Sequence, residues 1–307
     1  MNAAEVTGRR RPAERVRVWE VGLGRGTGEP SGQSGSTDDA VVRRHEDRLA
    51  AEEPLEVRLS WPGRPAERVA VTMRTPGNDF ELAAGLLHAE GVLESADDLH
   101  TVAYCTDHTL TAEQKYNVVT VEMSVQPRRE PPARYAGLAA ATSACGVCGT
   151  ESIDDVLAMC TTTAPAGDAE TLTPLAPAVL ASLPDLLRGQ QRLFDSTGGL
   201  HAAGLFEADG SPIVVREDIG RHNAVDKVVG HQLLAGHTTA APVLAVSGRI
   251  GFEIVQKAVA AGIGVLAAVG APSSLAIRLA EQAGLCAVGF VRGARFVIYT
   301  CPERIGV

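Results

Sequence analysis

Two cysteines three positions apart are the densest chemical signal in the sequence. Cys145 and Cys148 stand in the motif Cys-Gly-Val-Cys-Gly, where Gly146 and Gly149 leave both sulfur atoms open to a bulky partner. A helix is predicted from about Ser152, and its N-terminal dipole favours a thiolate, whereas the three carboxylates that follow the pair disfavour one. Such a pair suits a metal half-site, a redox dithiol or a sulfur carrier that holds a persulfide, and the residues leave these three open.

A zinc-dependent hydrolase is the sharpest alternative. A structural zinc ion needs about four ligands, yet the sequence has no second cysteine pair, and His231 and His237 lie in a different predicted unit. A zinc deaminase combines His-x-Glu with Pro-Cys-x-x-Cys, and His88 and Glu90 followed by the cysteine pair match part of this signature. Ala144 stands where the proline belongs, and His88 is predicted at a helix end. A deaminase-like hydrolase with the cysteines as metal ligands therefore stays the alternative.

The other cysteines stand singly in apolar or mixed surroundings: Cys105, Cys160, Cys286 and Cys301. We interpret each as a small buried hydrophobic residue. Six cysteines in 307 residues are too few for a disulfide scaffold, and no apolar run follows the arginines at positions 9–11. We therefore expect a cytoplasmic protein.

A second group of polar residues follows predicted strands in the C-terminal half. Arg221 and His222 lie in a charged string that begins at Glu217, Arg249 lies in Ser-Gly-Arg, and His201 enters a strand after Thr-Gly-Gly-Leu. In open α/β sheets, ligands bind beyond the carboxyl ends of strands, where helix N-termini point N–H groups at anions. We therefore predict that His201, Arg221, His222 and Arg249 bind a phosphorylated ligand.

For two further groups of residues, the sequence leaves two interpretations open. Asp226 and Lys227 suit a ligand site and equally suit solvated salt bridges at a helix start. The turn near the C-terminus either grips an anion with its two arginines or is a simple exposed hairpin. This turn comprises Phe290, Val291, Arg292, Gly293, Ala294 and Arg295. None of the glycine patterns is a P-loop or a dinucleotide fingerprint.

Hydrophobic periodicity places these motifs on alternating elements. Beyond Gly198 it predicts strands at 200–206, 213–216, 243–246, 264–268, 287–291 and 296–299, and helices at 223–234, 251–260 and 274–283. Earlier in the chain it predicts strands at 55–59, 68–73 and 116–125, and helices from Asn78 or Asp79 to Ala89 and at 180–187. The later alternation is typical of an α/β layer with helices on its sheet faces.

Composition excludes several classes of protein. Hydrophobic residues make up 45% and charged residues 21% of the chain, so disorder over its whole length is excluded. A net charge of −9 argues against a protein that coats nucleic acid, although it leaves room for a local basic pocket. The uncharged stretch 258–277 is long enough to span a bilayer, but its glycines and proline indicate a buried strand, a turn and a helix start.

The first fifty residues read differently from the rest. Residues 1–50 show no sustained period, and residues 22–37 have the Gly, Ser and Thr content of a linker. We predict a flexible N-terminal extension at 1–50, with regular structure beginning near Pro54.

Together these motifs resemble the formate dehydrogenase accessory sulfurtransferase family (FdhD, also called NarQ-like). The likeness runs from about Glu53 to Ile305. It rests on Thr75-Pro-Gly-Asn-Asp-Phe-Glu-Leu-Ala-Ala-Gly, Cys-Gly-Val-Cys-Gly, Thr197-Gly-Gly-Leu-His, the string from Glu217 to Lys227, Ser247-Gly-Arg and the arginine-bearing C-terminal turn. The string from Glu217 to Lys227 is far more specific than the cysteine pair alone.

The resemblance implies a sulfur carrier. A cysteine desulfurase would pass sulfur to Cys145 as a persulfide, and Cys148 would be the second thiol, which either assists transfer or resolves the persulfide. The sulfur would then go to the molybdenum cofactor, bis-molybdopterin guanine dinucleotide, before insertion into formate dehydrogenase. Residues 290–295 would be the cofactor-binding stretch. The resemblance further implies a homodimer and no resident metal, and we expect neither nucleic acid nor a membrane as a partner.

The resemblance also implies an architecture. A cytidine-deaminase-like, three-layer α/β domain is expected at 171–307, a smaller N-terminal α+β subdomain at 51–135, and the cysteine loop with a linker at 136–170. On such a scaffold the His-x-Glu match would be an accident. The cofactor carries several phosphates, so four arginines are expected to form a local positive cleft. These are Arg221, Arg249, Arg292 and Arg295.

Overall fold

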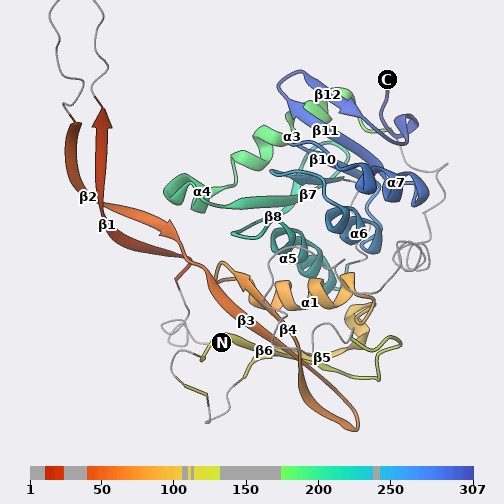
Figure 1. The fold of residues 1–307 in the computed structure, drawn as a ribbon. Coiled ribbons are helices and arrows are strands. Elements are labelled where there is room, and N and C mark those ends of the chain that lie inside the picture. The colour runs from red at the N-terminus through yellow and green to blue at the C-terminus, as the bar shows by residue number, and fades with distance from the viewer. Residues whose placement is uncertain (1–10, 24–39, 106–109, 112–113, 132–173, 238–242) are drawn as a thin grey trace, which may run out of the picture.

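A six-stranded sheet forms the larger part of the molecule in the computed structural model, which describes residues 11–23, 40–105, 110–111, 114–131, 174–237 and 243–307 (Figure 1). Its strand order is β12-β11-β10-β9-β7-β8. The strands are β7 (His201–Phe206), β8 (Pro212–Asp218), β9 (Val243–Val246), β10 (Val265–Ala268), β11 (Cys286–Arg292) and β12 (Arg295–Ile298). β9, β10 and β11 run parallel, β7 is antiparallel to β8 and β9, and β12 is antiparallel to β11.

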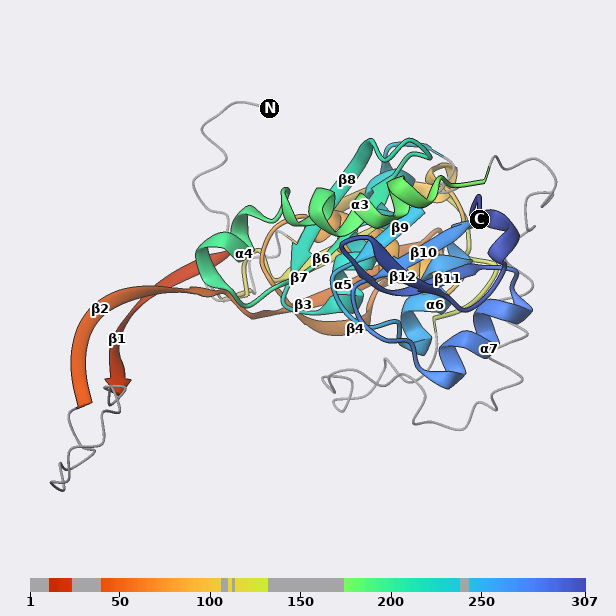
Figure 2. The same ribbon diagram turned by 90° about the horizontal axis from the view of Figure 1, so that it is seen from above.

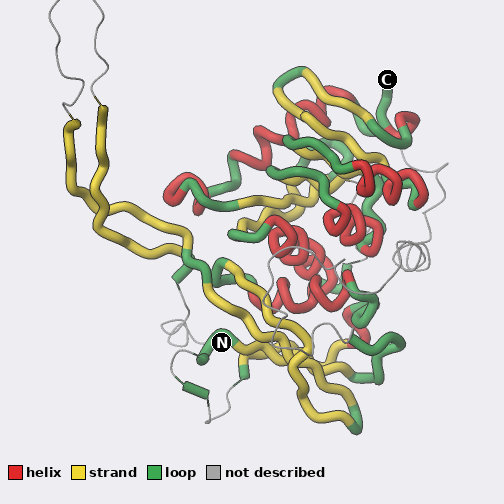
Figure 3. Tube along the Cα trace, viewed as in Figure 1, coloured by secondary structure: helices red, strands yellow, loops and turns green. Residues whose placement is uncertain are grey.

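Helices cover both faces of this sheet (Figure 3). On one face lie α5 (Arg221–Leu234), α6 (Phe252–Ala260) and α7 (Ser274–Gln282), whose buried side chains share one core cluster with β7, β9 and β10. On the other face α3 (Pro177–Arg188) buries Leu180, Leu183 and Leu187. The predicted α/β layer with helices on its faces is therefore confirmed, and the finer likeness to a cytidine deaminase stays a prediction.

The N-terminal half forms a smaller α+β unit. Its sheet has the order β4-β3-β6-β5, with β3 (Glu53–Trp61), β4 (Arg64–Arg74), β5 (Leu99–Tyr104) and β6 (Val118–Met123). Helix α1 (Asp79–Ala89) packs Leu82, Ala83 and Leu87 against this sheet, and the short helix η2 (Ala96–Asp98) leads into β5. This α1 segment follows the predicted bounds, with Asn78 at its N-cap in the left-handed region at φ 57°.

The two units are joined where α1 crosses α5. A Cβ added at Gly85 would lie 1.9 Å from Asp226 O, and one added at Gly230 would lie 1.9 Å from Glu81 O. Real Cβ atoms do not approach a carbonyl oxygen that closely, so both positions require glycine. The reciprocal glycines bring the two helix backbones into direct contact and fix how the two units pack.

A two-stranded arm extends from the N-terminal unit. β1 (Ala13–Leu23) and β2 (Ala40–Ala50) form an antiparallel ribbon that projects well beyond the rest of the molecule (Figure 2). Trp19 is 61% exposed on this ribbon, and Arg44 lies over its ring at 5.0 Å. The expectation that regular structure begins only near Pro54 is therefore wrong. Charged and apolar residues alternate in part of β1, but β2 has a central run of charged residues and no alternation. Most residues of both strands are exposed, so no apolar stripe marks a core.

The remaining predictions agree with the structure to within a few residues, with four omissions. The sequence did not predict β5, the short helix α4 (Arg192–Thr197) or the 3-10 helices η2 and η5 (Pro302–Arg304). The helix predicted from Ser152 lies outside the described residues. Residues 258–277 divide among the end of α6, all of β10 and the start of α7, as expected. Within the described part of the chain, no helix is long and apolar enough to cross a membrane.

Candidate functional site

The residues predicted to bind a ligand lie along one edge of the six-stranded sheet. Both β8 and β9 are antiparallel to β7, so β8, β9, β10 and β11 all end at this edge, while β7 and β12 begin there. We call it the carboxyl edge, and it carries His201, Arg221, His222, Arg249, Phe290, Val291, Arg292, Gly293, Ala294 and Arg295. Strand direction thus brings together residues up to 94 positions apart, as expected for a ligand site of an α/β sheet.

The turns of the carboxyl edge touch one another. Gly270 N donates to Gly248 O at 3.0 Å, and Phe290 N donates to Gly270 O at 3.1 Å. A Cβ at Gly270 would lie 2.7 Å from Gly248 O, whereas one at Gly248 would lie 3.6 Å from His201 Nδ1 and 3.9 Å from Arg221 Cδ. Glycine at position 270 therefore permits the close approach that packs the turns after β9, β10 and β11 together.

Phe290 adds backbone strain at this edge. Its φ is 54°, in the left-handed region, and its side chain is 40% exposed at the irregularity of β11 between Gly289 and Arg292. A bulky residue in this region costs on the order of 1–3 kcal/mol, and such strain concentrates at ligand sites. The observation agrees with a binding role for residues 290–295, which stays a prediction.

The four arginines of the carboxyl edge differ from those in the interior. Arg74 and Arg216 each form bonds to carboxylates, Arg74 to Asp79 at 2.9 Å and Arg216 to Glu81 at 2.6 Å. Within the described residues, by contrast, no hydrogen bond or ion pair engages the guanidinium groups of the edge arginines, which are Arg221, Arg249, Arg292 and Arg295. Their place at one edge of the sheet agrees with the expected positive cleft for phosphates, which stays a prediction.

Two histidines and a glutamate sit beside these arginines. Burial, together with the nearby Arg221 and His222, lowers the pKa of His201 below its usual range. His222 Nε2 lies 3.5 Å from a Glu253 carboxylate oxygen, and this proximity together with Arg221 lowers the pKa of Glu253. The buried Nε2 of His222 has no hydrogen-bond partner within the described residues, and its contact to Glu253 is an ion pair at long range. Sequence reasoning missed Glu253, since no spacing links position 253 to 222.

The inward-facing residues of the string from Glu217 hold the two units together. Asp218 is fully buried and accepts bonds from Thr75 N at 3.1 Å, Asn223 Nδ2 at 2.9 Å and Lys227 Nζ at 2.7 Å. Lys227 also donates to Thr75 O at 2.9 Å, and Ile219 N donates to Thr75 Oγ1 at 3.1 Å. Lys227 is buried, so the interpretation of Lys227 as a solvated surface charge is wrong.

Two other acids of this string also have structural partners. The Glu217 carboxylate accepts from Leu193 N at 2.9 Å and Phe194 N at 2.7 Å, and so caps the N-terminus of α4. Asp226 is buried and pairs with Lys257 Nζ at 2.6 Å, although burial raises its pKa. Many of the charged residues between Glu217 and Lys227 therefore have contacts that stabilise the fold, and these residues need no ligand to explain them.

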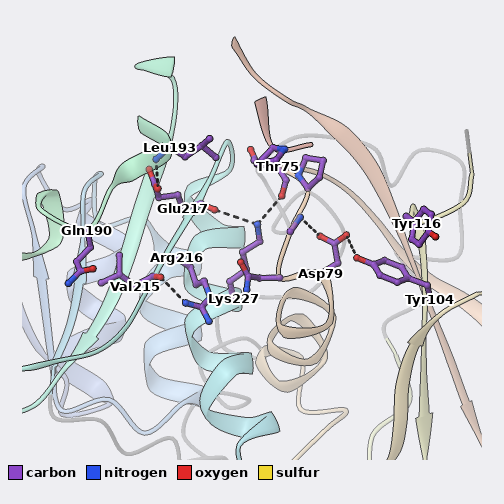
Figure 4. Close-up of a pocket in the computed structure, with 14 residues that line it drawn as sticks. Thr75, Asp79, Tyr104, Tyr116, Gln190, Leu193, Val215, Arg216, Glu217 and Lys227 are labelled. Atoms are coloured by element: carbon purple, nitrogen blue, oxygen red, sulfur yellow. Dashed lines mark hydrogen bonds between the residues drawn. The ribbon is translucent and has the colours of Figure 1, made fainter. Parts of the chain in front are cut away.

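A cavity of about 340 Å³ lies between the two units, beside β8 (Figure 4). Tyr104 and Tyr116 line it from the N-terminal unit, and Gln190, Leu193 and Val215 line it from the opposite side. The Tyr104 hydroxyl donates to Asp79 at 3.0 Å. No sequence pattern pointed to this cavity, because its walls come from seven separate segments of the chain.

The cysteines fall into two groups. Cys145 and Cys148, the predicted sulfur-bearing pair, lie outside the described residues, as does Cys160. Burial raises the pKa of Cys286 to about 12, and burial also raises that of Cys301. A thiol this weakly acidic is a poor nucleophile, which agrees with the structural interpretation of Cys286. Cys105 and Cys301 are only partly buried, so the interpretation of these two as buried residues is wrong. Arg58 Nη1 lies 3.9 Å from the sulfur of Cys105.

The contacts of His88 do not favour the zinc alternative. Its Nδ1 lies 2.8 Å from Leu93 O and its Nε2 lies 3.1 Å from Ala260 O, so both ring nitrogens face carbonyl oxygens rather than a metal position. Glu90 follows at the C-cap of α1, as predicted. No group of three metal-ligating side chains occurs among the residues that the structure describes.

Comparison with known proteins agrees with the sequence motifs. The FdhD/NarQ family matches residues 50–306. The chain is 50% identical over 270 residues to the "Sulfur carrier protein FdhD" of Streptomyces avermitilis, covering 88% of this chain and 93% of that protein. It is 48% identical over 272 residues to the protein of the same name from Mycobacterium tuberculosis, covering 87% and 94%.

One solved structure shares the fold. A protein from Desulfotalea psychrophila, described as a formate dehydrogenase accessory protein, superposes with a TM-score of 0.63 over 95% of this chain and 99% of its own length, at 22% identity. The match over residues 50–306, together with identities near 50%, shows that the chain belongs to the FdhD/NarQ family.

Proposed function

We propose that this protein is a sulfur carrier that serves formate dehydrogenase, taking sulfur from a cysteine desulfurase onto Cys145 and delivering it to the molybdenum cofactor. The observation that carries the proposal is the family match over residues 50–306, which spans the motif of Cys145 and Cys148. Relatives near 50% identity are named sulfur carrier proteins.

The transfer step needs no external oxidant. The Cys145 thiolate attacks the outer sulfur of the desulfurase persulfide, forming one S–S bond while the donor S–S bond breaks. The donor cysteine leaves as a thiolate with the electron pair of the broken bond, and the transferred sulfur keeps its oxidation level. Cys148 then assists release of that sulfur toward the cofactor.

The carboxyl edge suits the cofactor as the bound substrate. Bis-molybdopterin guanine dinucleotide carries several phosphates, and Arg221, Arg249, Arg292 and Arg295 offer unpaired guanidinium groups. His201 and His222 lie among them, and Phe290 offers an exposed ring. We extend the proposal to a homodimer in the cytoplasm, as the family resemblance implies.

Mass spectrometry of the intact protein tests the sulfur-carrier proposal. After incubation with a cysteine desulfurase and cysteine, the wild-type protein should gain the mass of one sulfur atom, which a reducing agent removes. Cys148→Ala should still gain it, and Cys145→Ala should not. Unchanged mass in the wild type, or a gain that maps to another cysteine, would refute the proposal.

The zinc alternative predicts a different result. A hydrolase with the cysteine pair as ligands would contain about one zinc per chain by elemental analysis, and Cys148→Ala would lose it. We expect zinc well below that ratio in a purified protein that still accepts sulfur.

A further inference from the structure

The edge strand β8 of the six-stranded sheet has an open side that faces the cavity. Ala202 uses its backbone groups on the β9 side, since its O accepts from Ser247 N at 3.0 Å and its N donates to Ser247 Oγ at 2.9 Å. Backbone direction alternates along a strand, so Ala203 bonds to its β8 partner, Arg216. Val215 and Glu217 must then direct their N–H and C=O groups away from the sheet.

The contacts of these two residues agree with that geometry. Val215 O accepts from Arg216 Nη1 at 3.0 Å, and Glu217 O accepts from Lys227 Nζ at 3.4 Å, so side chains cover both outward carbonyls. The outward N–H groups of Val215 and Glu217 have no partner within the described residues. They stand two residues apart, roughly 7 Å, and both residues line the cavity.

The other walls of the cavity offer amides, a hydroxyl and apolar rings. The side-chain amides of Asn78 and Gln190 and the Tyr116 hydroxyl have no hydrogen-bond partner within the described part of the chain. Pro76 and Tyr104 supply apolar surface. Figure 4 shows Tyr104 and Tyr116 opposite Gln190 and Val215.

The charges that line the cavity are already neutralised. Asp79 is paired with Arg74, Lys227 with Asp218, and Arg216 with Glu81. The Glu217 carboxylate is held by two backbone N–H groups of α4. An anionic ligand would meet the carboxylates of Asp79 and Glu217 in this cavity. The cavity therefore favours an uncharged ligand whose hydrogen-bond acceptors are spaced like the carbonyl groups of a β-strand.

We propose that this cavity binds an extended, uncharged peptide segment of the acceptor enzyme, formate dehydrogenase, which adds to the open edge of β8. Main-chain carbonyls of the segment accept from Val215 N and Glu217 N, in the manner of strand addition. The assignment to the acceptor rests on the proposed function. Glu217 is the second-last residue of β8, and Arg221 and His222 begin α5 shortly after it, so a bound segment lies next to the carboxyl edge where the cofactor would be released.

A proline at position 215 tests the proposal. Val215→Pro removes the outward N–H and leaves the ladder to β7 intact, as edge strands tolerate. Val215→Ala keeps the N–H and is the matched control. With the full-length chain and purified apo-formate dehydrogenase of the same organism, calorimetry should show affinity reduced about tenfold or more for the proline variant, and nearly unchanged for the alanine variant. Equal affinity of both variants would overturn the proposal.

A second measurement keeps the test decisive if the proline variant does not fold. A photo-crosslinking residue at the exposed Gln190 should crosslink to a peptide of formate dehydrogenase, while the same residue at Gln282, which is exposed on α7, should not. No crosslink at Gln190, or a crosslink to the desulfurase alone, would overturn the assignment to the acceptor.

Persulfide loading separates this inference from the proposed function. Val215→Pro should load sulfur on Cys145 as the wild type does, because the cavity concerns the acceptor and not the donor. Loss of loading in this variant alone would show that the edge serves the donor and would overturn the inference. Failure of the wild type to load would refute the sulfur-carrier function instead.

Discussion

The two sides of the string from Glu217 to Lys227 put similar residue types to different uses. On the inner side, Asp218 and Lys227 are buried and fully bonded to each other and to Thr75. On the outer side, Arg221 has no bonding partner within the described residues, and the nearby His222 Nε2 lacks a hydrogen bond. Charged residues in one continuous motif therefore divide into those that hold the two units together and those left available to a ligand.

The largest effect should follow a change on the inner side. Lys227→Met leaves the buried Asp218 carboxylate without its cation, which should lower the free energy of unfolding by about 3–5 kcal/mol. Denaturant unfolding followed by circular dichroism measures this loss. Arg221→Ala should lie within about 0.5 kcal/mol of the wild type. Equal losses for the two variants would remove the distinction between the inner and outer sides.

A smaller loss of stability should follow a change where α1 crosses α5. Gly230→Ala places a methyl group against Glu81 O, and overpacking of this kind costs about 1–3 kcal/mol. Gly199→Ala is the control, because the nearest atom to an added Cβ there is 3.8 Å away. Thermal unfolding of both variants checks the prediction, and a stable Gly230→Ala would show that the helices can separate without cost.

A change on the outer side should affect binding rather than stability. Arg249→Ala should weaken binding of guanosine diphosphate by about tenfold, since a charge-assisted bond to phosphate contributes about 1.5–3 kcal/mol. Calorimetry measures the affinity, and the melting temperature should not move. Arg278→Ala, at an exposed position of α7, is the control. Equal affinities of the two variants would place the phosphate site elsewhere.

The smallest effect concerns pH. The pKa of His201 is lowered in the folded protein. As the pH falls below about 6.5, the imidazole of His201 is therefore protonated in the unfolded chain but not yet in the folded one. The free energy of unfolding decreases as the pH falls from there toward the lowered pKa. His201→Asn should reduce this loss, by less than about 1 kcal/mol because the site is partly exposed to solvent. Unfolding titrations between pH 7.5 and 5 compare the two slopes, and identical slopes would contradict the prediction.

The fold of the C-terminal half follows closely from its sequence. Short apolar runs such as Val243–Val246 alternate with amphipathic helices, and both signals are local. The arm and β5 escaped prediction, because none of the residues of β5, and almost none of those of the arm, are fully buried, so these strands carry no apolar run. The helix crossing at Gly85 and Gly230 depends on an approach between residues 145 positions apart, which no local pattern encodes.

The candidate site was predictable in part, for a similar reason. Glycine-bearing turns after strands pointed to Arg221 and Arg249, and these turns lie at one edge because β8 and β9 are both antiparallel to β7. The same reasoning gave Lys227 two interpretations, because its burial depends on Thr75 in a distant segment. Glu253 and the cavity beside β8 arise only from packing, so no spacing could indicate them.

The close crossing of α1 and α5 limits how this protein can move. The two helices are in backbone contact, and the bonds from Arg216 to Glu81 and from His88 to Ala260 O cross the same junction, so moving the halves apart would break all of these contacts. Under the proposed function, sulfur would then travel on a loop or with the visiting protein, while the packed body of the molecule stays in place.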